Sequence, residues 1–461
     1  MSEAPQSPGF FEGFENILKK YIIQILVLVV LYFLWRNGML TDFIKEILAL
    51  VGVFIFGKWA WRVWLHYIQN DFISGIDFVL LEIVPPREVL RSPKSMELFF
   101  TNALYHWSQK GGKEEYWQGA VWLWFSLEIA SIDGQVHFYI RTPTRIRNLI
   151  ETQMYAQYPQ AQVKVVEDYT LAVDEISEKS SWGAWGCEFK LFKPEALPIK
   201  TYVDFGLDKD PKEEFKVDPI APIIEFFGSL QKGEQAWLQI LVTASQVKYK
   251  TEGTWFEEHD WVEESKVFLK KFLKPYTNIR ENGSVEIRVP DFLSNSIKGV
   301  SGKITKVGFD TGIRVMYVAK KDVYDSNRRK DIRLIFRQYA NPDSNQLWRY
   351  NHTAGDAIGA SIFGLSKKQV TLLAHRMLRE YQERGFFHHP LRHQLFNEHS
   401  FPWVIKLFIK NFFLPYVHSV TFVLNTEELA SLWHFPGQTL KVPTLERIES
   451  KEAAPPTNLP I

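Results

Sequence analysis

Two apolar stretches near the N-terminus constrain the fold of this chain more than any other feature. Residues 21–35, YIIQILVLVVLYFLW, are almost entirely apolar, and residues 43–65, FIKEILALVGVFIFGKWAWRVWL, have an apolar centre from Ile47 to Gly57. Each uninterrupted run is shorter than the ~20 residues of a membrane-spanning helix, but flanking apolar and tryptophan residues extend both. The pattern predicts a two-helix transmembrane hairpin over residues 19–66, preceded by an N-terminal tail over residues 1–18.

Two other interpretations of these stretches fit less well. Helices buried in a soluble core usually keep a polar face, and neither stretch has one. A cleaved signal peptide would end at a small-residue cleavage site and would not be followed by a second apolar run. The hairpin is therefore the favoured interpretation.

The flanking cations predict how the hairpin is oriented. Lys19 and Lys20 precede the first stretch, and Lys58 and Arg62 follow the centre of the second. Because basic residues favour the cytoplasmic side, this distribution predicts a multi-pass protein of the cell (inner) membrane. Both termini and all soluble domains would then lie in the cytoplasm.

Charge and cysteine content exclude two classes of protein. The chain has 54 Lys and Arg residues against 53 Asp and Glu residues, so it lacks the strongly basic balance of a dedicated nucleic-acid-binding protein. Its single cysteine, Cys187, excludes an intramolecular disulfide and any zinc site built from several cysteines.

The chain after the apolar stretches predicts an α+β domain over residues 71–176. Asp133–Gly134, between two alternating runs, is a hairpin signal, and Ser92–Pro93 begins a helix well. The elements follow the order of a ferredoxin-like unit, βαββαβ. They are a strand (78–86), a helix (92–107), two strands (121–143), a helix (143–159) and a strand (161–169).

A second set of elements in the same order predicts a further α+β domain over residues 187–436. Its strands are expected at 187–193, 234–245, 312–321 and 419–425, with helices at 218–230 and 328–339 and inserted helices at 255–276 and 367–384. The predicted fold class is α+β: the transmembrane hairpin followed by two tandem ferredoxin-like sandwiches with helical insertions. A proline-rich C-terminal strap follows over residues 437–461.

No recognisable catalytic motif is present, which predicts a protein without enzymatic activity or cofactor. The nearest match to a phosphate-binding loop, SIKGVSGKIT, has Ile297 where the first glycine belongs and Ile304 where a hydroxyl is needed. It is better interpreted as a glycine-rich turn. The spacing of His388, His389, His393 and His399, with Glu398, would allow a zinc site, but a surface loop is the simpler interpretation.

The segment after the last predicted strand is the best candidate for docking a partner. Either Asn425 or Thr426 can cap a short helix whose first turn carries Glu427 and Glu428. The apolar residues that follow should pack on the last sandwich, leaving the strap after Gln438 to reach a partner. The candidate docking residues are Asn425, Glu427, Glu428, Trp433, His434, Phe435 and Pro436.

Several long motifs resemble a bacterial family. LEIVPPREVLRSPKSMELFF, FSLEIASIDGQVHFYIRTP and GLDKDPKEEFKVDPIAPIIEFFGSLQKGEQAWLQI, within residues 78–460, are similar to a membrane-anchored N-terminal module of unknown function. This module precedes HerA/FtsK-like ATPase domains in components of type IV secretion and conjugation. The resemblance implies a split version of such a protein, with the ATPase encoded separately.

The resulting hypothesis is a non-catalytic platform anchored in the lipid bilayer that docks a cytoplasmic HerA/FtsK-like ATPase of a type IV secretion or conjugation-like machine. Two alternatives stay open: a DNA-contacting guide element of the same machine, and an uncharacterised membrane enzyme. Homo-oligomerisation and DNA contact are likewise left open, since basic residues gather only locally, around residues 328–337.

Overall fold

The computed structural model describes residues 32, 42–86, 89, 91–106, 111–209, 217–246, 248–250, 257–279, 285–287, 289–353, 367–388, 419–437 and 445. The predicted tail (1–18), all but Tyr32 of the first apolar stretch, and His389, His393, Glu398 and His399 lie outside these residues. Of the predicted strap, Gly437 and Leu445 are described. The chain divides into two compact units: residues before Ile73 with 112–119 and 390–414, and the rest.

The described part of the first unit consists of two helices. The long helix α2 (Asp42–Ser74) continues two residues beyond the unit, and α4 (Gly112–Tyr116) packs on its second half. The Trp64 indole donates to the Tyr116 carbonyl at 3.3 Å and meets the Trp117 ring edge-on. At Gly119, which has φ of +67°, a Cβ would lie 2.2 Å from the Ile68 carbonyl oxygen. Only glycine therefore allows this close approach.

None of the described helices is both long enough and apolar enough to cross a membrane. Helix α2 contains the second apolar stretch, but Lys58 and Arg62 interrupt the run that begins at Ile47 before it reaches ~20 residues. The predicted transmembrane hairpin over residues 19–66 is therefore wrong. The predicted multi-pass location in the cell membrane is wrong for the same reason.

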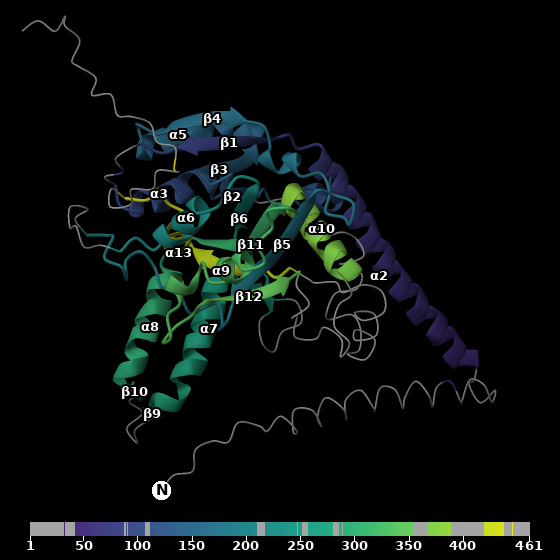
Figure 1. Cartoon of the computed structure of the whole chain (residues 1–461). Helices are drawn as coiled ribbons and strands as arrows, with labels where there is room; N and C mark the ends of the chain where they lie inside the picture. Colours follow the sequence, from purple (N-terminus) through teal and green to yellow (C-terminus); the bar gives the residue numbers. More distant parts are fainter. Residues whose placement is uncertain are drawn as a thin grey trace, which may run out of the picture. The chain divides into compact units, whose positions relative to one another are not determined.

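A single antiparallel sheet of nine strands organises the second unit (Figure 1). Its order is β12-β5-β11-β6-β2-β3-β1-β4, and β13 pairs with β11. The strands are β1 (Phe78–Val84), β2 (Phe125–Ile132), β3 (Gln135–Pro143), β4 (Gln162–Val166), β5 (Trp182–Leu191), β6 (Glu234–Ala244), β11 (Gly308–Lys320), β12 (Leu347–His352) and β13 (Phe422–Asn425).

The first half of the sheet has the ferredoxin-like strand order β4-β1-β3-β2. Two helical segments connect its strands: α3 (Lys94–Phe99), which runs into the π-helical η1 (Phe100–Leu104), and α5 (Arg147–Gln157), which follows η2 (Thr144–Ile146). Asp133 and Gly134 join β2 to β3 with φ of 53° and 84°. Two positive values are typical of the type I′ turn, which matches the twist of a hairpin.

The second half departs from the expected order at its last strand. It contains β5, α6 (Ala221–Gly228), β6, β11, the helical turns α9 (Arg328–Ile332) and η5 (Arg337–Tyr339), and β13. Strand β12, rather than the last strand, lies beside β5 at the sheet edge. Strand β13 pairs with Gly308–Thr311 of β11, beyond the residues of β11 that pair with β5. It therefore continues the line of β5.

The two predicted sandwiches are fused. Strand β2 pairs with β6 along its whole length, from Phe125 opposite Val242 to Ile132 opposite Gln235. The class α+β is correct, but two separate tandem sandwiches are not what forms. Nearly every residue of β2 is buried, so an open edge here would expose an apolar strand to solvent and to aggregation.

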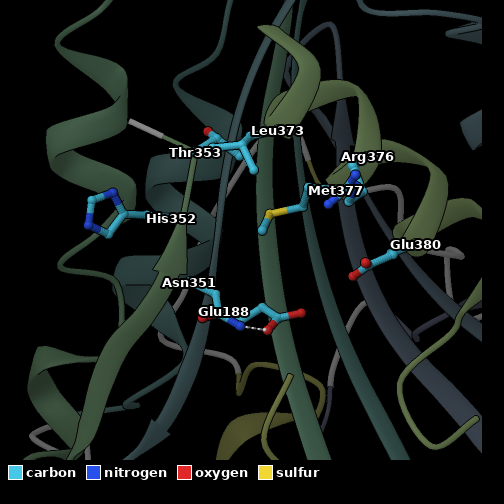
Figure 2. A pocket seen from close by; sticks show the side chains of 8 residues that line it. All are labelled: Glu188, Asn351, His352, Thr353, Leu373, Arg376, Met377 and Glu380. Atoms are coloured by element: carbon cyan, nitrogen blue, oxygen red, sulfur yellow. Dashed lines mark hydrogen bonds between the residues drawn. The ribbon is translucent and has the colours of Figure 1, made fainter. Parts of the chain in front are cut away.

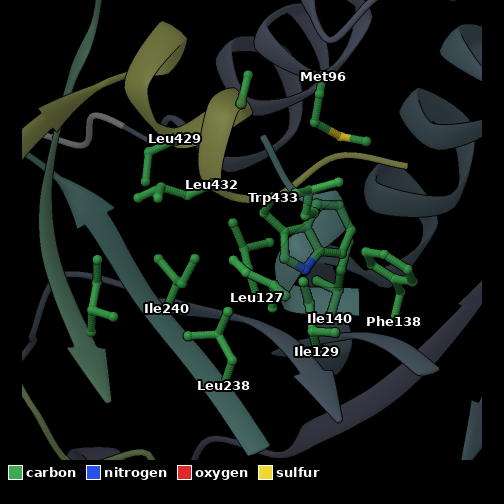
Figure 3. Close-up of a cluster of buried hydrophobic side chains, with 14 of the residues drawn as sticks. Met96, Leu127, Ile129, Phe138, Ile140, Leu238, Ile240, Leu429, Leu432 and Trp433 are labelled. Atoms are coloured by element: carbon green, nitrogen blue, oxygen red, sulfur yellow. The ribbon is translucent and has the colours of Figure 1, made fainter. Parts of the chain in front are cut away.

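One face of the sheet carries the main core. Alternate residues of β2, β3 and β6 point to this face and meet α3, α5, α6 and α13 (Thr426–Leu432), as Figure 3 shows around Trp433. The side chains include Leu127, Ile129, Phe138, Ile140, Leu238 and Ile240 from the sheet and Met96, Leu429 and Leu432 from the helices.

The opposite face, which we call the α10 face, carries a smaller core. Helix α10 (Lys367–Glu383) places Met377, Leu378 and Tyr381 against Trp237 of β6 and Met316 of β11. The short η3 (Tyr169–Ala172) leads into Val173, which joins the same cluster. This face also carries most of the buried charges described below.

The inserted segments form a two-helix arm of α7 (Trp261–Leu273), which continues into η4 (Lys274–Tyr276), and α8 (Asp291–Ile304). Two short ribbons, β7 (Tyr249–Lys250) with β8 (Glu258–His259) and β9 (Thr277–Ile279) with β10 (Val285–Ile287), accompany it. The sequence SIKGVSGKIT lies in the last turns of α8, so its interpretation as a glycine-rich turn is wrong.

Candidate functional site

A row of polar side chains crosses the α10 face at paired positions of seven neighbouring strands. Because side chains alternate along a strand, residues paired in register share a face of the sheet. The row begins on β1 near one edge and ends on β12 at the other. Its members, which we call the polar row, are Glu82, Tyr139, Glu128, Gln239, Arg314, Glu188 and Tyr350.

The centre of the polar row is an ion pair between Glu128 and Arg384, whose side chains are both fully buried. The guanidinium donates from Nε to Oε1 at 3.0 Å and from Nη2 to Oε2 at 3.2 Å. It also donates from Nη1 and Nη2 to the carboxylate of Asp168. Burial alone would raise the pKa of Asp168, but Arg384 holds it below its usual value. One cation thus serves two carboxylates.

Hydroxyl and amide donors occupy the remaining acceptor positions of Glu128. Ser126 Oγ lies 2.5 Å and Gln239 Nε2 3.3 Å from Oε1, and Tyr169 Oη donates to Oε2 at 2.8 Å. The Tyr169 hydroxyl in turn lies 2.9 Å from that of Tyr381 on α10. A buried carboxylate with this many donors has no lone pair left for a substrate.

Arg384 occupies a backbone position that usually belongs to glycine. It follows the last residue of α10 and has φ of 52°, in the left-handed region. This conformation costs a non-glycine residue roughly 1 kcal/mol or more. The ion pairs made by its side chain offset that cost and fix the end of α10 over the sheet.

A second charged cluster lies on the other half of the polar row. Arg314 donates to Glu188 Oε1 from Nη2 at 2.7 Å and to Glu380 Oε2 at 3.1 Å. Asn351 Nδ2 donates to Glu188 Oε2 at 2.7 Å. Asn351 has φ of 46° and lies where the pairing of β12 shifts, and such a bulge redirects a side chain. Ser419 completes the cluster, with its hydroxyl 2.7 Å from Glu188 Oε1.

A small pocket opens beside this second cluster, between β5, the end of β12 and α10 (Figure 2). Its cavity volume of about 20 Å³ is enough for about one water molecule. Among the described residues, no three His, Cys, Asp or Glu side chains are placed to hold a metal ion. The lining residues are Glu188, Asn351, His352, Thr353, Leu373, Arg376, Met377 and Glu380.

The charge of Glu380, one of the lining residues, changes near neutral pH. Burial raises its pKa from about 4.5 to about 7; Arg314 opposes the shift and the Glu188 carboxylate adds to it. Because the folded-state pKa is raised, folding stability is lost as pH rises from 4.5 through 7. Glutamine mimics the neutral acid. Glu380→Gln should therefore match the parent near pH 4.5 and be roughly 3 kcal/mol more stable at pH 8.

Chemical denaturation of both proteins from pH 4.5 to 8 measures this difference. Glu225→Gln is the matched control, because Glu225 is exposed on α6 and does not contribute to the pKa shift of Glu380, whereas Glu383 on the same helix does. A Glu380→Gln protein that is less stable than the parent at pH 8 would show that the ionised carboxylate stabilises the fold.

The candidate docking residues gather around α13, and all of them are buried except Glu427, which is half-buried. Asn425 and Glu428 form a capping box: Glu428 N donates to Asn425 Oδ1 at 2.8 Å, and Asn425 N donates to Glu428 Oε2 at 3.0 Å. Glu428 is also paired with Lys303 at 3.0 Å, both side chains being fully buried. Glu427 binds Lys306 at 2.6 Å and accepts from Thr201.

The residues after α13 are held just as firmly. His434 Nε2 lies 2.9 Å from Asp218 Oδ1, and this partner lowers the pKa of Asp218 although burial would raise it. Phe435 and Pro436 are buried as well. Direct contact between a partner and these residues would require the segment to move. Their docking role stays a prediction.

Trp433 packs on a different part of the chain from the one expected. Its ring contacts Phe100 and Phe138, and its indole nitrogen donates to the Glu128 carbonyl at 3.3 Å. These residues belong to the first half of the sheet, not to the last sandwich. Trp433 thus joins the C-terminal segment to the first half of the sheet and its helices.

The polar row was not found from the sequence, although a signal exists. Glu82, Glu128 and Glu188 are each the only acidic residue of a largely apolar strand: FVLLEIV, FSLEIASI and WGAWGCEFKL. A lone acid in a buried strand needs a cation. The cations that pair with Glu188 and Glu128 are Arg314 and Arg384, each more than a hundred residues away along the chain. No local sequence pattern could reveal these pairs.

A known protein family covers most of the second unit. Residues 123–447 match the family described as a domain of unknown function, DUF8128. The chain belongs to this family. The matched region begins just before β2 and includes the second half of the sheet, α10, α13 and Leu445. The DUF8128 region therefore contains all of the polar row except Glu82.

No curated protein and no solved structure matches the chain. The description of the matched family, a domain of unknown function, gives no support to a link with HerA/FtsK-like ATPases, with secretion or with conjugation. The expectation of a type IV secretion or conjugation component, like that of transmembrane helices, is therefore corrected.

Proposed function

We propose that this DUF8128 protein is a non-catalytic platform that holds a HerA/FtsK-like ATPase. The resemblance of its long motifs to the module that precedes such ATPases supports the partner. The proposal of a non-catalytic role is supported by the buried charges, because each buried acid of the polar row is paired with a buried cation or donor. In the polar row, Glu128 and Glu188 each bind several donors, and their arginines are buried with them. A nucleophile or general base must come within hydrogen-bond distance of the substrate. The buried carboxylates of Glu128 and Glu188 are instead bonded to donors of the protein itself.

The fixed position of α13 and residues 433–437 carries the proposal. Trp433 bonds to β2, and His434 bonds to Asp218 at the start of α6. Lys306 binds both Glu427 of α13 and Glu97 of α3, at 2.6 and 2.9 Å. A partner attached to the chain after Gly437 would pull on both halves of the sheet at once. This is the property a platform needs.

Binding of the ATPase to deletion variants tests the proposal. Leu445 is buried and bridges to Val136, so deletion of Thr439–Ile461 removes a core side chain as well as the strap. A shorter deletion, Ile448–Ile461, leaves Leu445 in place, and Leu445→Ala in the full chain is the matched control. Each variant is immobilised and exposed to a purified HerA/FtsK-like ATPase from the same genome.

We expect the full chain and Leu445→Ala to capture the ATPase and the shorter deletion to lose at least 90 % of the capture, roughly 1.4 kcal/mol of binding free energy. Full capture by the deletion of Thr439–Ile461 would show that docking lies elsewhere. No capture by the full chain would reject the ATPase as the partner.

A further inference from the structure

The imidazole of His434 is buried between two hydrogen-bond acceptors. Its Nδ1 lies 2.8 Å from the carbonyl oxygen of Ala430 in α13, and its Nε2 lies 2.9 Å from Asp218 Oδ1. His434 is only 1 % exposed, so water cannot replace either partner. Carbonyl and carboxylate oxygens only accept, and a neutral imidazole has a single N–H. Both bonds therefore form together only if the His434–Asp218 pair holds one proton more than a neutral histidine and a carboxylate.

The contacts of Asp218 place this proton on the histidine. Ile220 N donates to Oδ1 at 3.1 Å and Gly437 N donates to Oδ2 at 3.2 Å, so each carboxylate oxygen already accepts a backbone N–H. Burial would raise the pKa of Asp218, but His434 and these two N–H groups hold it below its usual value. Asp218 is therefore the anion of a buried ion pair, and His434 is the imidazolium.

The other described titratable groups near the pair have their own partners or stay neutral. Tyr339 of η5 interacts with Asp218, and burial together with this carboxylate raises the pKa of Tyr339 well above its usual value. Its hydroxyl donates to a carbonyl oxygen of α13 at 3.0 Å. Glu427 and Glu428 of α13 are each paired with a lysine. Among the described residues, the charge of the pair is thus set by His434 and Asp218.

We propose that His434 and Asp218 form a pH-sensitive latch, which holds residues 434–437 against the turn before α6 while the imidazole is protonated. Loss of the proton removes one of the two hydrogen bonds of His434 and leaves Asp218 buried without its cation. A buried carboxylate without a cation is strongly destabilised, so residues 434–437 open. This inference does not rest on the proposed ATPase partner.

The latch should be strongest in mildly acidic solution. An unperturbed histidine has a pKa of about 6.5, so above this pH closing the latch requires the uptake of a proton, and stability is lost as the pH rises. Asp218 acts in the opposite direction. Because its folded-state pKa is lowered, its contribution is present above about pH 3.8 and is lost as the pH falls through the folded-state value.

Hydrogen exchange of the full chain at about pH 6 and pH 8, with each rate divided by the intrinsic rate at that pH, tests the proposal. The Gly437 amide reports opening directly, because it bonds to Asp218. Its opening equilibrium constant should rise roughly 5- to 25-fold between the two pH values. The upper value applies if His434 keeps its proton until the latch opens.

Two variants separate the latch from other effects of pH. In His434→Gln no group titrates at this position, so the opening constant of Gly437 should be the same at both pH values. His106→Gln is the matched control, because the His106 ring meets one acceptor, the Ala103 carbonyl at 2.9 Å, and needs no second proton. This variant should keep the pH dependence of the parent.

Nitrogen NMR of protein labelled with ¹⁵N-histidine tests the protonation state independently of stability. At pH 7, where an unperturbed histidine is mostly neutral, most His434 rings should carry a proton on both nitrogens. The signals are assigned by their loss in His434→Gln. A neutral His434 ring at this pH would overturn the proposal, as would an equal pH dependence of Gly437 in His434→Gln. A Gly437 opening constant equal to that of the β2 amides would show that residues 434–437 open only with the whole sheet, which would also overturn it.

Discussion

Replacing Arg384 with methionine should reduce the free energy of unfolding by about 3–5 kcal/mol. The substitution leaves Glu128 buried without its cation, and it also removes the partner of Asp168. Removing one member of a buried ion pair costs more than the pair itself contributes, because the remaining charge cannot return to water. Urea denaturation of the parent and the variant measures the difference.

Two further variants separate charge from packing. Arg379→Met, on the same helix but exposed, should change stability by no more than about 0.5 kcal/mol. Adding Glu128→Gln to Arg384→Met removes the uncompensated charge and should recover part of the lost stability. A double-mutant cycle of the two substitutions reports this recovery as the coupling energy between Glu128 and Arg384. A loss in Arg384→Met no larger than that in Arg379→Met would contradict the central position of this ion pair.

Trp433→Ala should be comparably damaging, with a loss of about 3–5 kcal/mol. Trp433 has no exposed surface, and its ring fills the space between Phe100, Phe138 and Phe435. Truncation leaves a cavity that the surrounding strands and helices cannot close, and the Glu128 carbonyl loses a donor.

The matched comparison for Trp433 is Trp348→Ala, which removes the same side chain from a half-exposed position on the edge strand β12. It should cost well under half as much. Thermal unfolding followed by circular dichroism gives both values. An equal loss of stability in the two variants would show that α13 and Trp433 do not hold the two halves of the sheet together.

Features encoded by neighbouring residues were predictable from the sequence. The cap at Asn425, with Glu428 three residues later, forms as a capping box because its donors and acceptors lie within one helical turn. The turn at Asp133–Gly134 forms because both residues tolerate positive φ. The elements of the first βαββαβ unit follow from such local signals, since turn residues, helix starts and the spacing of apolar residues mark each strand and helix within its own segment.

Features that depend on distant pairing were not predictable. The sequence of β2 does not indicate that this strand pairs with β6. The prediction of two separate sandwiches is wrong because of this pairing. Strand β13 could not be distinguished by its sequence from a strand that flanks β5. The apolar centre of α2 reaches the length of a membrane-spanning helix only together with the tryptophans that follow it, and Lys58 and Arg62 lie among these tryptophans.

Hydrogen exchange measured by mass spectrometry across a urea series tests the fusion of the two repeats most directly. Because β2 and β6 pair along their full length and Trp433 joins α13 to β2, the amides of β2 and β6 should share one protection energy, equal to the global free energy of unfolding. A single unfolding transition should accompany them. Two transitions, with β1–β4 exchanging while β5, β6 and β11 stay protected, would contradict the continuous sheet and restore two independent domains.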